Sequence, residues 1–300
     1  MQIVGTMKRT LRALNYPYFR ECARGVLDGK FPIFVKYPFH PAQRYGFGKP
    51  PHAGIHALFD ARRAAIRQQL ENIRQFEPDF LRIKDHEDPD ALQPYWNNGY
   101  FPALDAMALY AYLAIQQPKL YIEIGSGNST KFARRAISDH KLATRIVSID
   151  PSPRAGIDAI SDEVIRHPLE TVDLKVFDQV APGDIVFFDG SHLSFMNSDV
   201  TTFFLEVMPA TPANTLIHIH DIYLPNDYPP TRTLHYESEQ YLLATMLLGG
   251  CDRFDVVMPI NFVEQEPDLC GVFESFWQQR ATVQKYGSSF WLRHLGQRNG

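Results

Sequence analysis

The sequence is poor in cysteine. Its 300 residues include only Cys22, Cys251 and Cys270, and no two of these form a Cys-x-x-Cys pair. Such an odd, sparse set argues against a disulfide-stabilised secreted scaffold and against a zinc knuckle. We therefore look elsewhere in the chain for the residues that carry chemistry.

Long apolar runs are also lacking. No stretch approaches 18 apolar residues without a charge, so we expect no membrane span. The first 21 residues have no apolar core behind their charges, which argues against a signal peptide. We expect a cytoplasmic protein.

Positive charge is not in excess. The formal net charge is -4, so bulk charge gives no reason to expect a nucleic-acid partner. Residues 1–50, however, carry nine Lys and Arg against two Asp and Glu, a balance of +7 that leaves -11 for the rest. This segment is interpreted either as a solvated basic arm or as a contact for an anionic partner, such as a phosphorylated substrate or a membrane surface.

The N-terminal third predicts an arm and a helical cap. Residues 1–53 are rich in Pro and aromatics, too aromatic for a disordered linker, and we expect them to pack on the main domain. An apolar stripe predicts one helix over 54–76, and Pro102 opens a second helix. We place the arm and cap in residues 1–95 and the main domain in 96–300.

From residue 120 onward, short apolar runs alternate with amphipathic segments. This rhythm predicts an α/β fold in which helices cover both faces of a mostly parallel sheet. Helices are expected over 129–140 and 197–210. The runs that we expect to be strands are 120–125, 145–150, 164–168, 184–190, 215–221, 254–259 and 288–294.

A glycine loop follows the first of these strands. The stretch 120–130 reads LYIEIGSGNST, so Gly125 and Gly127 stand between a strand and a helix. Glycines there allow a sharp turn and a close approach to a ligand, and ligands of open α/β sheets bind at the carboxyl ends of strands. Ser129 or Thr130 is expected to cap the following helix.

The second strand ends in Asp150, which could accept hydrogen bonds from both hydroxyls of a ribose. A dinucleotide site would need a third glycine where Thr130 stands, and a carboxylate at Glu123 would repel a pyrophosphate. The same carboxylate suits a cofactor with a cationic amino group and no phosphate. S-adenosylmethionine (SAM) fits this description, and the absence of a Gly-x4-Gly-Lys-Ser/Thr motif excludes a P-loop.

Five motifs in order, EIGSGNST, SIDPSPR, DIVFFDGSH, HIHDIYLP and ESEQYLL, resemble the class I SAM-dependent methyltransferases. The chain is most similar to their small-molecule O-methyltransferase branch, methyltransferase family 24, over roughly residues 95–260, whereas 1–90 shows no clear match. The resemblance implies a Rossmann-like seven-stranded sheet whose last strand, 288–294, is antiparallel. It also implies Asp150 on the ribose and, around the methionine part of SAM, Glu123, Gly125, Ser126 and Gly127.

We assign three further residues to the cofactor site: Thr130, Asp189 and Tyr100. Tyr100 belongs to an Asn-Asn-Gly-Tyr-Phe loop that would cover the cofactor, although ordinary aromatic packing explains it equally well. We interpret the segment HYESEQYLLATMLLGG, residues 235–250, as a packing helix in which the Glu239 carboxylate would face the cleft. His218 is interpreted as structural.

Acids and histidines gather after the fourth and fifth strands. Asp189 and His192 follow one strand, and His220 and Asp221 end the next, so the four should converge above the sheet. One interpretation makes a histidine the general base that takes a proton from a substrate hydroxyl. A second has Asp189 and Asp221, with or without His220, hold a divalent metal, Mg or Mn. The third is a polar network that only orients loops and binds cofactor.

The leading hypothesis is a SAM-dependent methyltransferase acting on a hydroxyl oxygen of a small metabolite or sugar. The catalytic candidates are His192, His220 and Asp221, and the metal candidates are Asp189 and Asp221. One alternative is an inactive methyltransferase fold that serves as a binding or scaffold protein, and another is an NAD-dependent oxidoreductase. The expected partner is a small-molecule acceptor, and a homo-oligomer is compatible with the sequence.

Overall fold

The computed structural model describes residues 17–27, 41–87, 92–153, 156–250 and 252–296. The chain divides into two compact units, Met1–Pro41 and Ala42–Gly300. The described element of the first unit is helix α2 (Pro17–Leu27). Most of the predicted basic arm lies outside the described residues, so its packing and its partner stay predictions. No helix in the described part of the chain is both long and apolar enough to cross a membrane.

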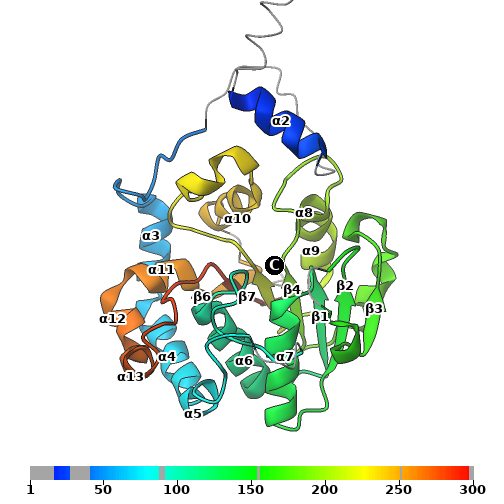
Figure 1. The fold of residues 1–300 in the computed structure, drawn as a ribbon, viewed down its shortest axis with the longest axis vertical. Coiled ribbons are helices and arrows are strands. Elements are labelled where there is room, and N and C mark those ends of the chain that lie inside the picture. The colour runs from blue at the N-terminus through cyan, green and yellow to red at the C-terminus, as the bar shows by residue number, and fades with distance from the viewer. Residues whose placement is uncertain (1–16, 28–40, 88–91, 154–155, 251, 297–300) are drawn as a thin grey trace, which may run out of the picture. The chain divides into compact units, whose positions relative to one another are not determined.

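The second unit is built on one seven-stranded sheet with the order β3-β2-β1-β4-β5-β7-β6 (Figure 1). Strands β1 to β5 are parallel to one another, and β7 is antiparallel to both β5 and β6. The predicted fold class, with its antiparallel last strand, is confirmed. Six of the seven expected runs contain a strand, and the seventh, 164–168, overlaps β3, which begins one residue earlier. The strands are β1 (Leu120–Ile124), β2 (Arg145–Ile149), β3 (Glu163–Ile165), β4 (Ile185–Phe188), β5 (Leu216–Ile219), β6 (Phe254–Pro259) and β7 (Phe290–His294).

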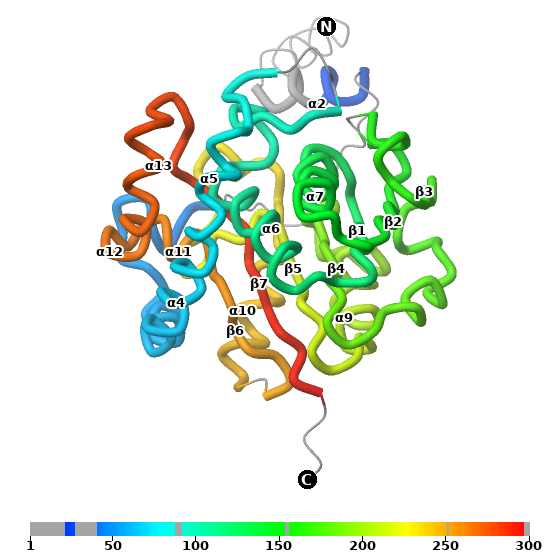
Figure 2. Tube along the Cα trace, turned by 90° about the horizontal axis from the view of Figure 1, so that it is seen from below, coloured from blue at the N-terminus to red at the C-terminus, as the bar shows by residue number. Residues whose placement is uncertain are grey.

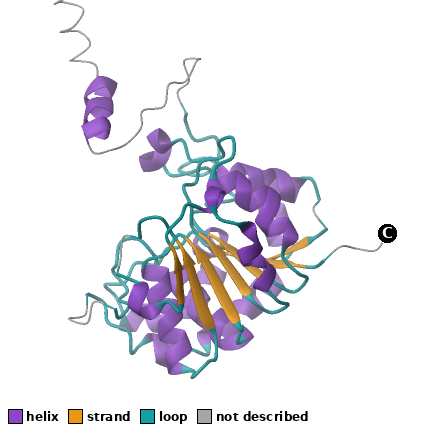
Figure 3. Cartoon of the chain, turned by 90° about the vertical axis from the view of Figure 1, so that its right-hand side faces the viewer, coloured by secondary structure: helices purple, strands orange, loops and turns teal. Residues whose placement is uncertain are grey.

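Helices cover both faces of this sheet (Figure 3). That explains why β1, β4 and β5 are apolar without alternation, since every residue in them is buried. Helices α6 (Ala103–Gln116) and α7 (Asn128–Asp139) lie side by side along the sheet (Figure 2). Both were expected from the sequence, and α6 is so enclosed that its residues from Ala103 to Ala114 are all buried.

The remaining helical elements are short. The α-helices are α3 (Ala53–Asp60), α4 (Arg63–Arg74), α5 (Glu77–Phe80), α8 (Asp199–Thr202), α9 (Met208–Ala210), α10 (Glu239–Leu248), α11 (Ile260–Gln265), α12 (Pro267–Cys270) and α13 (Glu274–Gln279). Short helical segments of other types are η1 (Asp158–Ile160), η2 (Leu169–Thr171), η3 (Leu174–Gln179), η4 (Phe203–Val207), η5 (Pro230–His235) and η6 (Gly271–Phe273).

Two helix predictions need correction. The single helix expected over 54–76 is two helices, α3 and α4, because the chain turns at Ala61 and Arg62, where Arg62 forms an ion pair with Asp255 of β6. No glycine or proline marks this break. The helix expected over 197–210 is α8 and α9 joined by the π-helical turn η4. Pro209 explains the wider turn, because it has no N–H to donate to the preceding turn.

The boundary predicted at residue 95, between the arm and cap and the main domain, stays a prediction. Helices α3, α4 and α5 of the predicted cap belong to the larger unit, and α4 packs beside α6 and β6.

Candidate functional site

A cavity of about 1170 Å³ opens at the carboxyl ends of the parallel strands. Its walls come from the loops after β1, β2, β4 and β5, which is where ligands of open α/β sheets bind. Nine of the eleven predicted site residues line it. They are Tyr100, Gly125, Ser126, Gly127, Asp150, Asp189, His192, His220 and Asp221.

Gly125 brings the loop after β1 against the loop after β4. Its φ is +78°, and a Cβ added there would lie 1.8 Å from the backbone oxygen of Asp189. Only glycine accepts both the left-handed backbone and this close approach. At Gly127, by contrast, a Cβ would meet nothing within 4 Å, so the loop faces open space there.

Glu123 lies beneath this loop and does not line the cavity. Its side chain is fully buried and accepts hydrogen bonds from Tyr121 Oη at 2.9 Å and from the Thr130 hydroxyl. Burial raises the pKa of Glu123 to about 7, against the opposing effect of the hydroxyl donors. The structure gives Glu123 a role in holding the loop. Direct contact with a cofactor stays a prediction, and repulsion of a pyrophosphate by this enclosed group is not supported.

Thr130 also acts from below the loop. The N-cap residue of α7 is Gly127, and Thr130, one of the two residues predicted to cap the helix, does so from the N3 position. Thr130 reaches back from the first turn of the helix, where its Oγ1 accepts the Gly127 N–H at 3.0 Å and donates to Glu123. A threonine therefore fills the place of a third glycine and ties the loop to the strand.

Asp150 is fixed beside the glycine loop. Its Oδ2 accepts the N–H of Ser126 at 2.8 Å, and its Oδ1 accepts the N–H of Ser152 at 2.7 Å. Oδ2 also accepts a long hydrogen bond from the Ser126 hydroxyl, at 3.4 Å, so Oδ1 is the oxygen that keeps a position for a ribose hydroxyl. The ribose contact itself stays a prediction.

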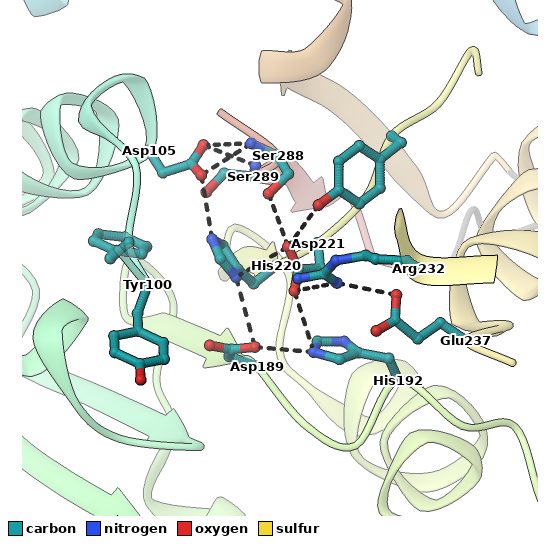
Figure 4. A network of polar contacts seen from close by, with 12 residues as sticks. Tyr100, Asp105, Asp189, His192, His220, Asp221, Arg232, Glu237, Ser288 and Ser289 are labelled. Atoms are coloured by element: carbon teal, nitrogen blue, oxygen red, sulfur yellow. Dashed lines mark hydrogen bonds and ion pairs between the residues drawn. The ribbon is translucent and has the colours of Figure 1, made fainter. Parts of the chain in front are cut away.

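The structure brings Asp189, His192, His220 and Asp221 together, and we call these four residues the strand-end cluster (Figure 4). His192 Nε2 lies 3.4 Å from both Asp189 Oδ1 and Asp221 Oδ2. His220 Nδ1 lies 3.6 Å from Asp189 Oδ1. The Asp189 side chain is more exposed than those of His192 and His220, the two histidines that it contacts, so it presents the cluster to the cavity.

Two members of the strand-end cluster have left-handed backbones, His192 at φ 62° and Asp221 at φ 55°. Such non-glycine residues cost on the order of 1–3 kcal/mol each and persist where their surroundings enforce them. The His192 carbonyl accepts the N–H of Ser238 at 2.8 Å, which anchors one of these turns. The strain places both side chains in the cluster just past their strands.

Asp105 is a site residue that the sequence analysis missed. It stands in α6, fully buried, and its carboxylate oxygens accept backbone N–H bonds from Ser288 and Ser289. Oδ2 also lies 3.2 Å from His220 Nε2. Asp105 is the one acid in the otherwise apolar run ALDAMALYAYLA. This could have marked it as a site residue, because a buried carboxylate needs polar partners.

His220 is consequently held from both sides. Burial lowers its pKa, but Asp189, Asp221 and Asp105 oppose burial and raise the pKa well above the usual 6.5. Its Nδ1 is enclosed and makes no hydrogen bond of good geometry with any described residue. The ring therefore presents one nitrogen to Asp105 and the other to the strand-end cluster.

His192 has its own acid behind it. Its Nδ1 contacts Glu239 Oε1, and Glu239 is fully buried at the start of α10. Burial lowers the pKa of His192, but the carboxylates of Glu239, Asp221 and Asp189 prevail and raise it to about 10. Glu239 does not line the cavity, so the cleft-facing role predicted for it is wrong, whereas Glu237 does line it.

Asp221 is the most heavily bonded acid. Its Oδ1 accepts from Tyr223 Oη and Ser288 Oγ, both at 3.1 Å. Its Oδ2 lies 2.7 Å from Arg232 Nη1, in addition to the contact with His192. Although burial raises the pKa of Asp221, His220, His192 and Arg232 hold it well below its usual range. A carboxylate has about four positions for donors, and here all four are taken.

Two other predicted residues have simple placements. His218 is fully buried, stacks on Phe187 with ring centroids 3.8 Å apart, and shares a 2.7 Å hydrogen bond with Ser289 Oγ. It does not line the cavity, so its structural interpretation fits its surroundings. Tyr100 lines the cavity and is 62% exposed, as a residue at its rim would be.

Comparison with known proteins gives one family match. The model of a family described as a methyltransferase domain matches residues 122–222, from β1 to just beyond β5. The resemblance predicted from the motifs is thereby confirmed for this segment. An uncharacterized protein of Archaeoglobus fulgidus is 34% identical over 90 residues, which cover 28% of this chain and 41% of that protein.

Solved structures show more distant likenesses. The SAH-bound methyltransferase PaMTH1 of Podospora anserina is 19% identical, with a TM-score of 0.43, over 71% of this chain and 91% of that one. The O-methyltransferase of Bacillus cereus in complex with SAH is 15% identical, with a TM-score of 0.34, over 76% and 91%. TomG of Streptomyces achromogenes, an O-methyltransferase in complex with SAM, is 16% identical, with a TM-score of 0.34, over 77% and 90%.

Proposed function

We propose that this protein is a SAM-dependent methyltransferase that methylates a hydroxyl oxygen of a small metabolite or sugar. One observation carries the proposal. The glycine loop and the strand-end cluster share a single cavity and touch where Gly125 meets Asp189. A cofactor bound along the loop would therefore place its reactive end beside the acids and histidines. The match to the methyltransferase family over the same strands supports this assignment.

The cofactor half is formed by the loops after β1 and β2. Gly127 leaves room for a ligand, Asp150 offers its carboxylate to a ribose through Oδ1, and Tyr100 stands at the rim. SAM supplies an already activated methyl group, so the chain's task is to align the acceptor and exclude water. Ser126 and Asp189 complete this part of the cavity wall.

The acceptor half is the strand-end cluster. As the new oxygen–carbon bond forms and the sulfur–carbon bond breaks, the acceptor hydroxyl must lose its proton. We assign that proton to Nδ1 of the neutral His220 ring, which faces the cluster while Nε2 is held by Asp105. Because the pKa of His220 is raised, this neutral form, and with it the rate of methyl transfer, should increase as the pH rises. The resulting imidazolium is stabilised by Asp105, and Asp189 and Asp221 lie within 4 Å of the receiving nitrogen. His192 and Arg232 hold Asp221 in place.

A divalent metal is the alternative form of assistance. One ligand atom from each of Asp189, His220 and Asp221 lies within 4.8 Å of the others, and His220 Nδ1 makes no hydrogen bond of its own. Mg or Mn there would acidify the acceptor hydroxyl. The donor set does not fit a resident ion in its present arrangement, because Asp221 is already saturated and Arg232 brings a positive charge to 2.7 Å from it.

Two other functions remain as outcomes of the test. A scaffold protein with this fold would bind SAM and transfer no methyl group to any acceptor, and an NAD-dependent oxidoreductase would bind NADH. The engaged hydroxyl of Thr130, in the place of a third glycine, supports SAM over a dinucleotide. The test is ligand binding first and methyl transfer from labelled SAM to a panel of hydroxylated acceptors second. A cytoplasmic location and a homo-oligomer stay predictions.

A further inference from the structure

An arginine in the cavity wall, Arg232, does more than hold Asp221. It stands in η5, between β5 and α10, and it lines the cavity. Its Nη1 lies 2.7 Å from Asp221 Oδ2 and donates a hydrogen bond to Glu237 Oε2 at 3.0 Å (Figure 4). A single nitrogen of the guanidinium group therefore meets both carboxylates.

The other two nitrogens of Arg232, Nε and Nη2, form what we call its open edge. No residue in the described part of the chain accepts a hydrogen bond from either of them, and neither nitrogen is enclosed. The guanidinium group lies over the Tyr223 ring, with Cζ 5.6 Å from the ring centroid. Arginine carries five N–H donors in a planar fork, and those on the open edge remain available to a ligand.

The loop that carries Arg232 is anchored by residues from near the start of the larger unit. Gln43 Nε2 donates a hydrogen bond to Thr233 Oγ1 at 3.1 Å. Asp227 Oδ2 accepts the N–H of Tyr45 at 2.9 Å. Because the loop is already held, little conformational entropy is lost when the open edge meets a ligand.

The two carboxylates limit which groups the open edge can bind. The side chains of Asp221 and Glu237 are only 10% and 7% exposed, and they offset the charge of Arg232. An anionic group would be attracted by Arg232 but repelled by both acids at close range. A neutral hydroxyl or carbonyl oxygen would accept the same hydrogen bonds without this repulsion.

Arg232 also lies next to the base assigned above. His220 Nδ1 lies 3.8 Å from Asp221 Oδ1, and Arg232 contacts the other oxygen of the same carboxylate. An acceptor whose reacting hydroxyl meets His220 would therefore bring a neighbouring oxygen to Arg232. Compact acceptors with several hydroxyl groups have such an oxygen.

We propose that Arg232 determines acceptor specificity. Its open edge binds a neutral oxygen beside the hydroxyl that is methylated, and Asp221 and Glu237 exclude acceptors with an anionic group at that position. The acceptor is therefore an uncharged polyol. This inference rests on the proposed function.

The first experiment uses inorganic phosphate to probe the open edge without any methyl transfer. Arginine binds phosphate in a bidentate manner, so phosphate should bind there once a repelling carboxylate is removed. Calorimetry would compare the wild type, Glu237→Gln, the double variant Glu237→Gln/Arg232→Met and the control Glu274→Gln. Glu274 is exposed and does not line the cavity. Thermal unfolding would be recorded for all four proteins.

Glu237→Gln should bind phosphate at least about 10-fold more tightly than the wild type and Glu274→Gln, because a like charge is removed at close range. The double variant should lose this gain. The inference is overturned if folded Glu237→Gln shows no gain, or if the gain survives without Arg232.

The second experiment measures methyl transfer from labelled SAM to paired acceptors, each pair being a neutral polyol and its phosphate monoester. The wild type should prefer the polyol by at least about 10-fold in kcat/KM, and Glu237→Gln should narrow this preference. Arg232→Lys keeps the charge but not the planar fork, so the KM for the polyol should rise and that for SAM should not change. Arg74→Lys, at an exposed arginine that does not line the cavity, is its control.

A wild-type preference for the phosphate monoesters would overturn the inference, as would an unchanged KM for the polyol in Arg232→Lys. If the wild type methylates neither member of any pair, it is the proposed function that fails.

Discussion

Asp105 and His220 stand 115 positions apart, and their side chains meet in the interior at 3.2 Å between Oδ2 and Nε2. One comes from α6 and the other from the end of β5, so the contact forms only when helix and sheet pack together. It fixes which nitrogen of His220 faces the strand-end cluster. Asp105 acts through His220 and is a positioning residue.

Replacement of Asp105 by Asn should lower the pKa of His220, because the variant removes one of the carboxylates that raise it above its usual range. Titration of the His220 ring by NMR would show this directly. Asp158→Asn, at an exposed acid that does not line the cavity, is the control. Once an acceptor is known, the acidic limb of the pH–rate profile should move to lower pH. The rate on the plateau of the profile should fall by up to about 100-fold. An unchanged His220 pKa would contradict the positioning role.

Glu123→Gln should make stability less dependent on pH. The pKa of Glu123 is raised from 4.5 to about 7 in the folded protein, so the folded state holds this proton more tightly than the unfolded state does. Below pH 4.5 both states are protonated, and as pH rises toward 7 the wild type loses roughly 3 kcal/mol that the variant keeps. Urea unfolding at pH 5 and pH 8 would measure the difference. The control is Glu274→Gln, at an exposed position. If the free energy of unfolding depended on pH equally in the wild type and in Glu123→Gln, the pKa of Glu123 would not be raised.

Gly125→Ala should damage both the fold and the cofactor site. Its left-handed backbone alone costs roughly 1–2 kcal/mol with an added Cβ, and the 1.8 Å approach to Asp189 forces the two loops apart. Gly271→Ala, where a Cβ meets nothing within 4 Å and the backbone is right-handed, should leave stability unchanged. Thermal unfolding and SAM binding would be compared. Normal SAM binding by Gly125→Ala would show that the loop does not approach a ligand as closely as we infer.

Excess chelator should leave methyl transfer unchanged. Asp221 already meets four donors, among them Arg232, so the cluster has little capacity for a divalent ion. Calorimetry should likewise detect no saturable binding of manganese below about 1 mM. The metal alternative would prevail if turnover stopped in chelator and returned with magnesium or manganese. If the wild type bound manganese and Asp189→Asn did not, the ion would be assigned to the strand-end cluster.

The sheet could be predicted from the sequence because buried parallel strands are continuous apolar runs. Runs such as that containing β4, IVFF, are apolar throughout since both faces are covered. The convergence of Asp189 and Asp221 could also be predicted, because the carboxyl ends of neighbouring parallel strands meet at one edge.

Features set by tertiary packing could not be predicted in this way. The inward direction of Glu123 depends on Tyr121 and Thr130, although its position in the motif suggested a ligand contact. The break between α3 and α4 has no glycine or proline to announce it. Asp105 was missed because its partners, the backbone of Ser288 and Ser289 and the ring of His220, are brought to it only by the fold.

The central claim is that the cavity binds SAM through the glycine loop and Asp150. The most direct test is a thermal-shift comparison of SAM, S-adenosylhomocysteine and NADH on the wild type, Asp150→Ala and the control Asp158→Ala. A ligand at 100 times its dissociation constant stabilises the folded state by about 2.7 kcal/mol, which should raise the melting temperature by about 5 °C. We predict this shift with the two SAM-type ligands, in the wild type and the control, and its loss in Asp150→Ala. A shift with NADH alone, or no shift with any of the three, would contradict the account.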